Sequence, residues 1–208
     1  MAANPIAPTV PEVREIARAQ MTPRTYTYDD FLALPNNGKR YEIIEGILYM
    51  ANAPSYDHQY VSMMLSRSLI NHVVEHGLGI VLAAPFEVHL AEDTRPVQPD
   101  VLFISTVRQP KAGAKYFEGV PDLIVEVISP SSLRLDRVIK FAAYEKAGVT
   151  EYWIADPKTR SIEVYVLTQL EDGMTEYVLL GSFVPGEMVQ SSVLSGIELA
   201  TQPMFASA

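Results

Sequence analysis

The sequence predicts a mixed α/β domain in which helices flank a central mixed sheet, with an extra hairpin before it and further strands after it. The spacing of apolar residues is helical between residues 56 and 76, strand-like in short runs that follow, and helical again before residue 148. A chain of 208 residues is long enough for one sizeable core. We therefore expect one domain over residues 25–208, preceded by a loosely ordered, proline-containing arm over residues 1–24.

The first part of the domain is expected to form a short helix, a hairpin and a long helix. A capping box that begins at Thr27 predicts a short helix ending near Leu34. Residues 41–50 hold two apolar runs around a glycine, which is the pattern of a hairpin. Ser55 can cap a helix over residues 56–76. The apolar stripe of that helix consists of Val61, Met64, Leu65, Leu69 and Val73.

Strands and a second helix are expected in the rest of the chain. Residues 123–128 are apolar except for one position, so this strand is predicted to be central and covered on both faces. Ser131 or Ser132 is expected to begin a helix that ends at Ala147. The other strands are predicted near residues 80–90 (with the clearest alternation over 86–90), 101–104, 151–156 and 161–167, with weaker ones near 177–180 and 193–199.

The net charge of −9 and the absence of cysteine limit the classes of function. Nonspecific DNA binding needs Lys and Arg to neutralise phosphates, so an acidic chain is not expected to coat DNA. A nuclease needs only local basic groups beside carboxylates that bind cations. Disulfides, thiolate zinc sites and cysteine nucleophiles are excluded, which fits a cytoplasmic protein. Neither a membrane span nor an export signal is predicted, because long unbroken apolar runs are missing.

Two carboxylates are the first candidates for a functional site. Glu126 interrupts the buried strand 123–128, and an isolated buried carboxylate is costly unless a cation, a metal or several hydrogen bonds compensate it. Asp100 follows Pro99 at the start of strand 101–104, where the chain is stiff. If the two strands are neighbours, the carboxylates share one space, which suits magnesium or manganese. The alternatives are an arginine partner for Glu126 and a turn-capping role for Asp100.

Lys140 and Glu42 are the next candidates. Lys140 lies on the helix that follows the Glu126 strand, at the edge of its apolar stripe, where it can overhang the end of the strand. Asp136 and Tyr144 lie one turn before and after Lys140 and can orient it. Glu42 begins a strand of the predicted hairpin, a position where a charged residue is also common without any function.

A second motif predicts a different chemistry. Residues 72–76 match the inverted zinc-protease pattern H-x-x-E-H, in which His72 and His76 would share one zinc with Glu75 as base. Histidines at the end of a helix are also favourable through the helix dipole, and no third ligand is evident. His58 and His89 are interpreted as ordinary surface or strand-face histidines.

Several segments together resemble a known family. These are RYEIIEGILYM, APSYDHQYV, APFEVHL, VQPDVLFIS and GVPDLIVEVISPSS, followed by D-x-x-x-K-x-x-x-Y-x-x-x-GV-x-EYWIADP. In combination they resemble the Uma-two-type proposed endonucleases, long catalogued as a domain of unknown function, over about residues 25–200. The resemblance implies the restriction-endonuclease-like fold of the PD-(D/E)XK superfamily, with an αβββαβ core.

The resemblance also implies a site and an activity. The metal ligands would be Asp100 and Glu126 for Mg²⁺ or Mn²⁺, with Lys140 and Glu42 as further catalytic residues and Gln98 as a support for the ligands. The broad superfamily pattern has its lysine two residues after the acid, but this position is Ile128 here. The implied activity is metal-dependent hydrolysis of phosphodiester bonds in DNA by a homodimer. A nuclease fold that has lost catalysis and serves in nucleic-acid binding or assembly, and a zinc peptidase, remain alternatives.

Overall fold

The computed structural model describes residues 25–51 and 53–205, so the predicted N-terminal arm lies outside the described residues. Its centre is a mixed sheet in which β7 and β8 pair in parallel and all other neighbours are antiparallel. From edge to edge the six strands are β10 (Thr175–Phe183), β9 (Ser161–Gln169), β8 (Glu151–Asp156), β7 (Leu123–Val127), β5 (Val101–Ser105) and β3 (Gly79–Ala83). The predicted central position of β7 is confirmed.

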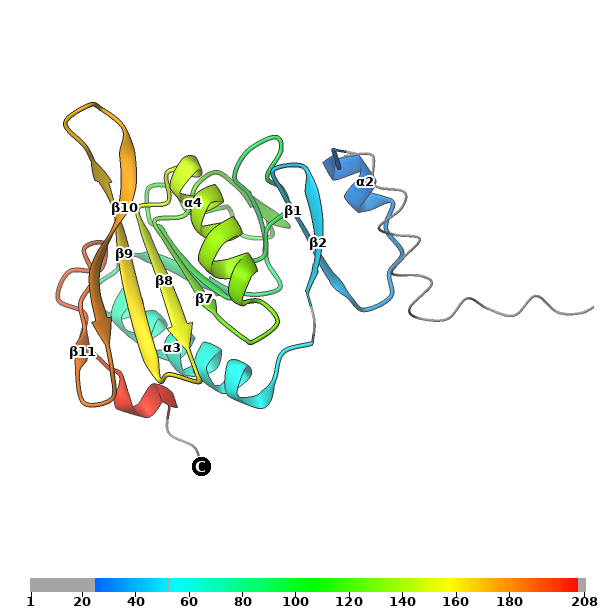
Figure 1. Cartoon of the computed structure of the whole chain (residues 1–208). Helices are drawn as coiled ribbons and strands as arrows, with labels where there is room; N and C mark the ends of the chain where they lie inside the picture. The colour runs from blue at the N-terminus through cyan, green and yellow to red at the C-terminus, as the bar shows by residue number, and fades with distance from the viewer. Residues whose placement is uncertain (1–24, 52, 206–208) are drawn as a thin grey trace, which may run out of the picture.

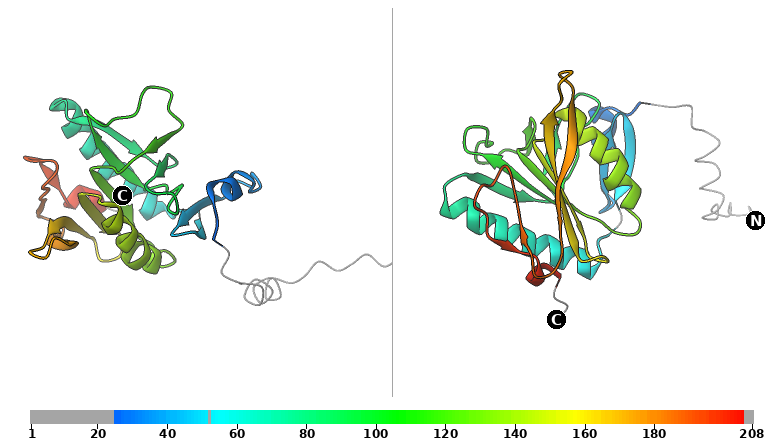
Figure 2. Two further views of the ribbon diagram at one scale, coloured as in Figure 1. Left: turned by 90° about the horizontal axis from the view of Figure 1, so that it is seen from above. Right: turned by 60° about the vertical axis from the view of Figure 1, so that its left-hand side comes forward.

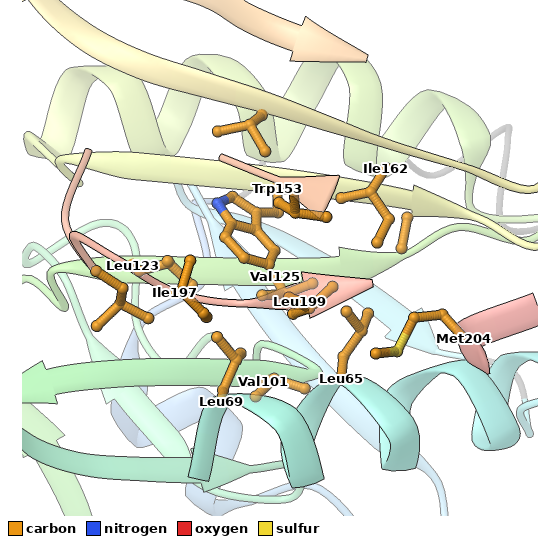
Figure 3. Close-up of a cluster of buried hydrophobic side chains, with 14 of the residues drawn as sticks. Leu65, Leu69, Val101, Leu123, Val125, Trp153, Ile162, Ile197, Leu199 and Met204 are labelled. Carbon is orange, nitrogen blue, oxygen red and sulfur yellow. The ribbon is translucent and has the colours of Figure 1, made fainter. Parts of the chain in front are cut away.

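One helix covers each face of this sheet (Figure 1). Successive residues of a strand point to opposite faces, so β5, β7 and β8 supply side chains to two cores. On one face, helix α3 (Tyr56–Glu75) packs Val61, Leu65 and Leu69 against Val125 and other strand residues. Figure 3 shows Leu65, Leu69 and Val125 in this core. On the other face, helix α4 (Phe141–Ala147) packs against the alternate residues of the same strands.

Helix α3 begins and ends as the sequence predicts. The Ser55 side chain accepts a hydrogen bond from the backbone N–H of His58, which satisfies one of the free donors at the helix start. The predicted stripe is buried at Val61, Leu65, Leu69 and Val73.

No helix in the described ranges 25–51 and 53–205 is long and apolar enough to cross a membrane.

The second helix differs from the expectation of one regular helix from Ser131 or Ser132 to Ala147. Residues Leu135–Lys140 form a π-helical segment, η1, which continues into α4 and ends at Gly148 in the left-handed conformation. A π-helical turn is wider than an α-helical one and is often found at functional sites. In this segment Asp136 and Lys140 are both buried, whereas the apolar side chain of Val138 is exposed.

The N-terminal elements form a small unit beside the sheet (Figures 1 and 2). Helix α2 (Tyr28–Leu32) carries the predicted capping box, in which the side chains and backbones of Thr27 and Asp30 bond reciprocally. The predicted hairpin consists of β1 (Arg40–Ile44) and β2 (Ile47–Ala51) and makes its own two-stranded sheet. The backbone N–H of Ile43 bonds to the carbonyl of Pro96, which ties the hairpin to the chain just before β5.

One predicted strand lies outside the central sheet, and another was wrong. The strand expected over residues 86–90 is β4 (Glu87–His89), which lies outside the central sheet and pairs in parallel with β6 (Tyr116–Glu118). The edge of the central sheet is taken by β3, whose apolar run has no alternation to distinguish it. The expected strand over 193–199 is a turn-rich segment between two short strands, β11 (Met188–Val189) and β12 (Leu199–Ala200), followed by the 3₁₀ turn η2 (Gln202–Phe205).

Candidate active site

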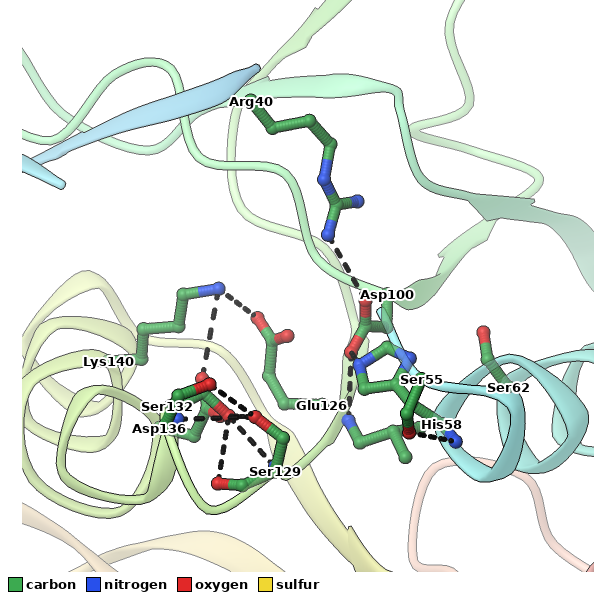
Figure 4. A network of polar contacts seen from close by, with 12 residues as sticks. Arg40, Ser55, His58, Ser62, Asp100, Glu126, Ser129, Ser132, Asp136 and Lys140 are labelled. Atoms are coloured by element: carbon green, nitrogen blue, oxygen red, sulfur yellow. Dashed lines mark hydrogen bonds and ion pairs between the residues drawn. The ribbon is translucent and has the colours of Figure 1, made fainter. Parts of the chain in front are cut away.

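The predicted site residues, except Tyr144, line one pocket of about 320 Å³. The pocket lies where the hairpin, the start of α3, the end of β7 and η1 meet, as Figure 4 shows in part. Strands β5 and β7 pair at Val101 and Val125, so one further step along this antiparallel register brings Asp100 opposite Glu126. The polar and charged side chains of the lining are Arg40, Glu42, Ser55, His58, Gln98, Asp100, Glu126, Ser129, Ser131, Ser132, Asp136 and Lys140.

Asp100 is held in its charged form. Its Oδ2 accepts a hydrogen bond from the backbone N–H of Val127 at 2.9 Å and lies 3.1 Å from His58 Nε2. The guanidinium of Arg40 lies 3.9 Å from Oδ1. Burial raises the pKa of Asp100, but the His58 contact, the charge of Lys140 and the Val127 N–H outweigh burial and bring this pKa below its ordinary value.

Glu126 is in the opposite electrostatic situation. Its Oε1 accepts hydrogen bonds from Lys140 Nζ at 2.8 Å and from the Tyr144 hydroxyl at 2.7 Å. Complete burial raises the pKa of Glu126 well above its ordinary value; Lys140 opposes the rise, and the negative charge of Asp100 adds to it. The native fold therefore disfavours ionisation of Glu126, and further positive charge in the pocket would oppose this effect.

Lys140 lies among carboxylates in a buried position and is only 4 % exposed. Its Nζ is 2.8 Å from Glu126 Oε1, 3.1 Å from Glu42 Oε2 and 3.9 Å from Asp136 Oδ1. Burial lowers the pKa of Lys140, but the surrounding carboxylates outweigh burial and raise it well above its ordinary value. Lys140 is therefore a protonated ammonium at neutral pH. Burial also raises the pKa of the neighbouring Asp136, to about 6.

Glu42 and Gln98 are joined through the backbone. The N–H of Gln98 donates a hydrogen bond of 2.6 Å to Glu42 Oε1, while Glu42 Oε2 faces Lys140. The side-chain Oε1 of Gln98 is buried at the pocket without a hydrogen-bond partner in the described structure. A buried acceptor without a partner is rare in folded proteins. An oxygen in this position is suited to a water, a donor group or a cation in the pocket.

The structure places the predicted residues together, with two changes in their contacts. Tyr144 was expected to orient Lys140, but its hydroxyl bonds to Glu126 instead. The cationic partner of Glu126 is Lys140, and not an arginine as the alternative to a metal site predicted. The predicted edge position of Lys140 was wrong, because the π-helical turn brings the side chain inside.

His58 and Arg40 were missed by the sequence analysis. The interpretation of His58 as an ordinary surface histidine was wrong, since it is buried and faces Asp100. A signal was available, because His58 precedes Val61 by three residues and Leu65 by seven and so falls on the buried stripe of α3. His89 is also buried, stacked on the ring of Tyr116 at 4.2 Å. Arg40 gave no local signal at all.

The H-x-x-E-H motif lies at the far end of α3. The rings of His72 and His76 are 4.4 Å apart, and His76 Nδ1 bonds to the carbonyl of His72. Within residues 25–51 and 53–205, no three His, Cys, Asp or Glu side chains are grouped so that they could hold a metal ion. The motif therefore lacks the third protein ligand that a zinc peptidase needs.

The succession α3, β3, β5, β7, α4, β8 is the αβββαβ core of a restriction-endonuclease-like fold. The chain belongs to the Uma2 family, described as "Putative restriction endonuclease", which matches residues 28–202.

Two further proteins are similar to this chain. A solved structure from Anabaena variabilis, described as a "putative nuclease belonging to DUF820", has a TM-score of 0.68 at 20 % identity and covers 86 % of this chain and 97 % of its own. An "Uncharacterized protein slr1290" of Synechocystis sp. is 26 % identical over 135 residues, which are 65 % of this chain and 69 % of the relative. At these identities the solved structure supports the fold, and the family match supports the family.

Proposed function

We propose that this protein is an endonuclease that hydrolyses phosphodiester bonds in DNA with the help of a divalent cation. The observation that carries the proposal is the meeting of Asp100 and Glu126 from neighbouring strands at one pocket, beside a buried lysine. Family membership supports a nuclease, and the pocket supports the choice of chemistry.

The side chains of the pocket fit Mg²⁺ or Mn²⁺. Four carboxyl groups line it against the two permanent cations Arg40 and Lys140, so ionised carboxylates would leave two negative charges uncompensated. Magnesium commonly binds through one or two carboxylates, with water and substrate phosphate completing its shell, so a third protein carboxylate is not needed. Asp100 and Glu126 would hold the ion, and the unpaired amide oxygen of Gln98 is an additional hard donor at the same pocket.

The other side chains of the pocket would orient the two carboxylates and stabilise negative charge on the substrate. A bound cation would supply an activated water and neutralise charge on the phosphate. His58 and the Val127 N–H fix the orientation of the Asp100 carboxylate, and Tyr144 fixes that of Glu126. Lys140, held by Glu42, presents an ammonium that can stabilise developing negative charge. Arg40 is partly exposed at the pocket and can donate to a phosphate oxygen.

A nuclease fold without catalysis, acting in nucleic-acid binding or assembly, is the second candidate. The net charge of −9 favours the assembly role within this candidate, because both binding and cleavage of DNA need basic groups for the phosphates. Under this alternative the polar network of the pocket would serve stability alone.

The test is cleavage of single- and double-stranded DNA by the full chain with Mg²⁺ or Mn²⁺, beside an EDTA control. We expect cleavage to disappear in EDTA and to fall at least about 100-fold in Glu126→Gln or Asp100→Asn, since each removes charge from a shared cation site. Glu163→Gln is the matched control. Glu163 of β9 lies in register with Glu126, because Ile154 of the intervening strand β8 pairs with both residues. Its carboxylate forms an ion pair with Arg137 and does not line the pocket.

Two results would contradict the proposal. One is activity that survives EDTA, and the other is activity that Glu163→Gln reduces as much as Glu126→Gln does. Binding of DNA without cleavage under any of these metals, by a folded wild-type chain, would favour the second candidate.

A further inference from the structure

A second, smaller hollow of about 120 Å³ lies beside the candidate active site. The first turn of α3 separates the two, since Ser55 and His58 line the active-site pocket whereas Tyr56 and Asp57 line the hollow. The turn between β8 and β9 forms the other wall. This turn begins where β8 ends, and the same end of β8 pairs with β7 at Val127. Because Val127 also lines the active-site pocket, both cavities lie at the same end of the sheet.

We propose that this hollow binds an unpaired nucleobase of the substrate, with Tyr56 as the stacking surface and Arg160 as the contact to the adjacent phosphate. The proposal rests on the proposed function, because it assumes that nucleic acid enters the neighbouring pocket. It specifies that the substrate is single-stranded, or locally unpaired, next to the bond that is cleaved.

Tyr56 has the properties of a base-stacking surface. Its side chain is 68 % exposed, although it is a large aromatic group. Tyr60 stacks behind it, with ring centroids 6.1 Å apart and planes 22° apart, and the Tyr60 hydroxyl bonds to the carbonyl of Pro203. Tyr60 therefore lies against one side of the Tyr56 ring, while most of the Tyr56 surface stays accessible to solvent. An open, supported aromatic ring is what proteins use to hold unpaired bases of any sequence.

Arg160 supplies the positive charge. It is exposed in the turn between β8 and β9, and its side chain makes no ion pair or hydrogen bond with residues 25–51 or 53–205. Its backbone has φ of +58°, a left-handed conformation in which glycine would be less strained. Glu45 has a similar φ of 50° in the turn of the β1–β2 hairpin, so the tight turn accounts for the backbone, and the feature that Arg160 adds is an exposed guanidinium.

Asp57 sets the polarity of the hollow. Its carboxylate would repel a phosphate, which therefore has to lie on the Arg160 side. The same carboxylate can accept a hydrogen bond from the exocyclic amino group of a base. The hollow thus combines an aromatic face, an acceptor and a cation, the three groups that one unpaired nucleotide requires.

The charge of the chain favours a single strand over a duplex. A duplex is held mainly through many phosphate contacts, and the net charge of −9 opposes such a surface. Stacking on Tyr56 adds affinity that does not depend on net charge, and only an unpaired base can use it. The hollow therefore explains how an acidic chain can hold nucleic acid at its active site.

The test is fluorescence anisotropy with a short labelled single-stranded DNA of mixed sequence and with the corresponding duplex, both in EDTA so that no hydrolysis occurs. We expect Tyr56→Ala to weaken single-strand binding about 5- to 100-fold and Tyr56→Phe to retain it. Met63→Ala is the matched control, because Met63 is 67 % exposed on the same face of α3 and does not line the hollow. Duplex binding should be the same in all three variants.

Arg160→Gly separates binding from folding. Glycine relieves the left-handed strain, so the melting temperature should equal or exceed that of the wild type. The affinity for the single strand should still fall. The slope of the logarithm of the binding constant against the logarithm of salt concentration should become less steep by about 0.7, because one phosphate contact is lost. Loss of affinity in a variant that is not destabilised cannot be attributed to misfolding.

The outcomes distinguish this proposal from the one on which it rests. If the wild type binds and cleaves single strands but Tyr56→Ala behaves like Met63→Ala, only the base site is refuted. If the wild type neither binds these strands in EDTA nor cleaves them with Mg²⁺ or Mn²⁺, the proposed function fails as well. If light scattering shows that Tyr56→Ala dissociates a dimer while affinity per protomer is unchanged, this face of α3 is a contact between copies and the base site is refuted.

Discussion

At the scale of single residues, the two central carboxylates should respond in opposite ways to loss of charge. The folded state lowers the pKa of Asp100 and raises that of Glu126. A lowered carboxyl pKa means that ionisation stabilises the fold at neutral pH, and a raised pKa means that ionisation costs stability. Without metal, Asp100→Asn should therefore lower the melting temperature, whereas Glu126→Gln should raise it by a few degrees.

Thermal unfolding in EDTA and with added Mn²⁺ measures this difference. The wild type should gain stability from Mn²⁺ through binding to the folded state, and both variants should lose that gain. Destabilisation by Glu126→Gln in EDTA, together with an unchanged response to Mn²⁺, would mean that Glu126 only pairs with Lys140.

Asp136 predicts a pH dependence of stability. Burial raises its pKa from 3.8 to about 6, so the unfolded chain loses this proton at lower pH than the folded chain does. Stability should therefore fall as pH rises from about 4 to about 6, by roughly 3 kcal/mol at most from this group, and then level off. Asp136→Asn should remove this fall. Its melting temperature should exceed that of the wild type at pH 7.5 and approach it near pH 4, and a gap that is constant with pH would contradict the assignment.

At the scale of elements, the edge strand β3 depends on a glycine. Gly79 has φ of +154°, and a Cβ at this position would lie 2.1 Å from the carbonyl oxygen of Ile104 in β5. Gly79→Ala should destabilise the fold by more than about 3 kcal/mol, because the clash is with backbone and cannot be relieved by a rotamer change. Gly148 is the control, since it ends α4 with φ of +87° and a Cβ there meets no atom within 4 Å.

Chemical denaturation of the two variants gives the comparison. Gly148→Ala should cost only about 1 kcal/mol, for the left-handed backbone alone. Similar losses for the two variants would show that β3 moves away from β5 easily.

At the scale of the whole molecule, a chain of net charge −9 needs local positive charge to hold a phosphate. Arg40 and Lys140 are at the active-site pocket and Arg160 is at the adjacent hollow, so the cations that a phosphate would meet lie at one end of the sheet. Because four carboxyl groups share the pocket with Arg40 and Lys140, a bound divalent cation would still have to supply the remaining positive charge under the proposed function. The homodimer remains a prediction, and the light-scattering measurement described above tests it.

The sequence alone was sufficient for the local features of this protein. The capping box of α2, the start and buried stripe of α3, the central strand β7 and the carboxylates Asp100 and Glu126 were all predicted. Each of these depends on residues a few positions apart, through helix or strand periodicity, a cap or a single polar residue in an apolar run. Such patterns are visible in one sequence.

The tertiary structure decided which distant segments meet. It placed β3 and not β4 in the central sheet, brought His58 and Arg40 to Asp100, and turned Lys140 inward through η1. The bond from Gln98 to Glu42 joins positions 56 residues apart. Local periodicity carries no information about such pairs, because their energies depend on burial and on charges that meet only after the hairpin, α3 and the sheet have packed together.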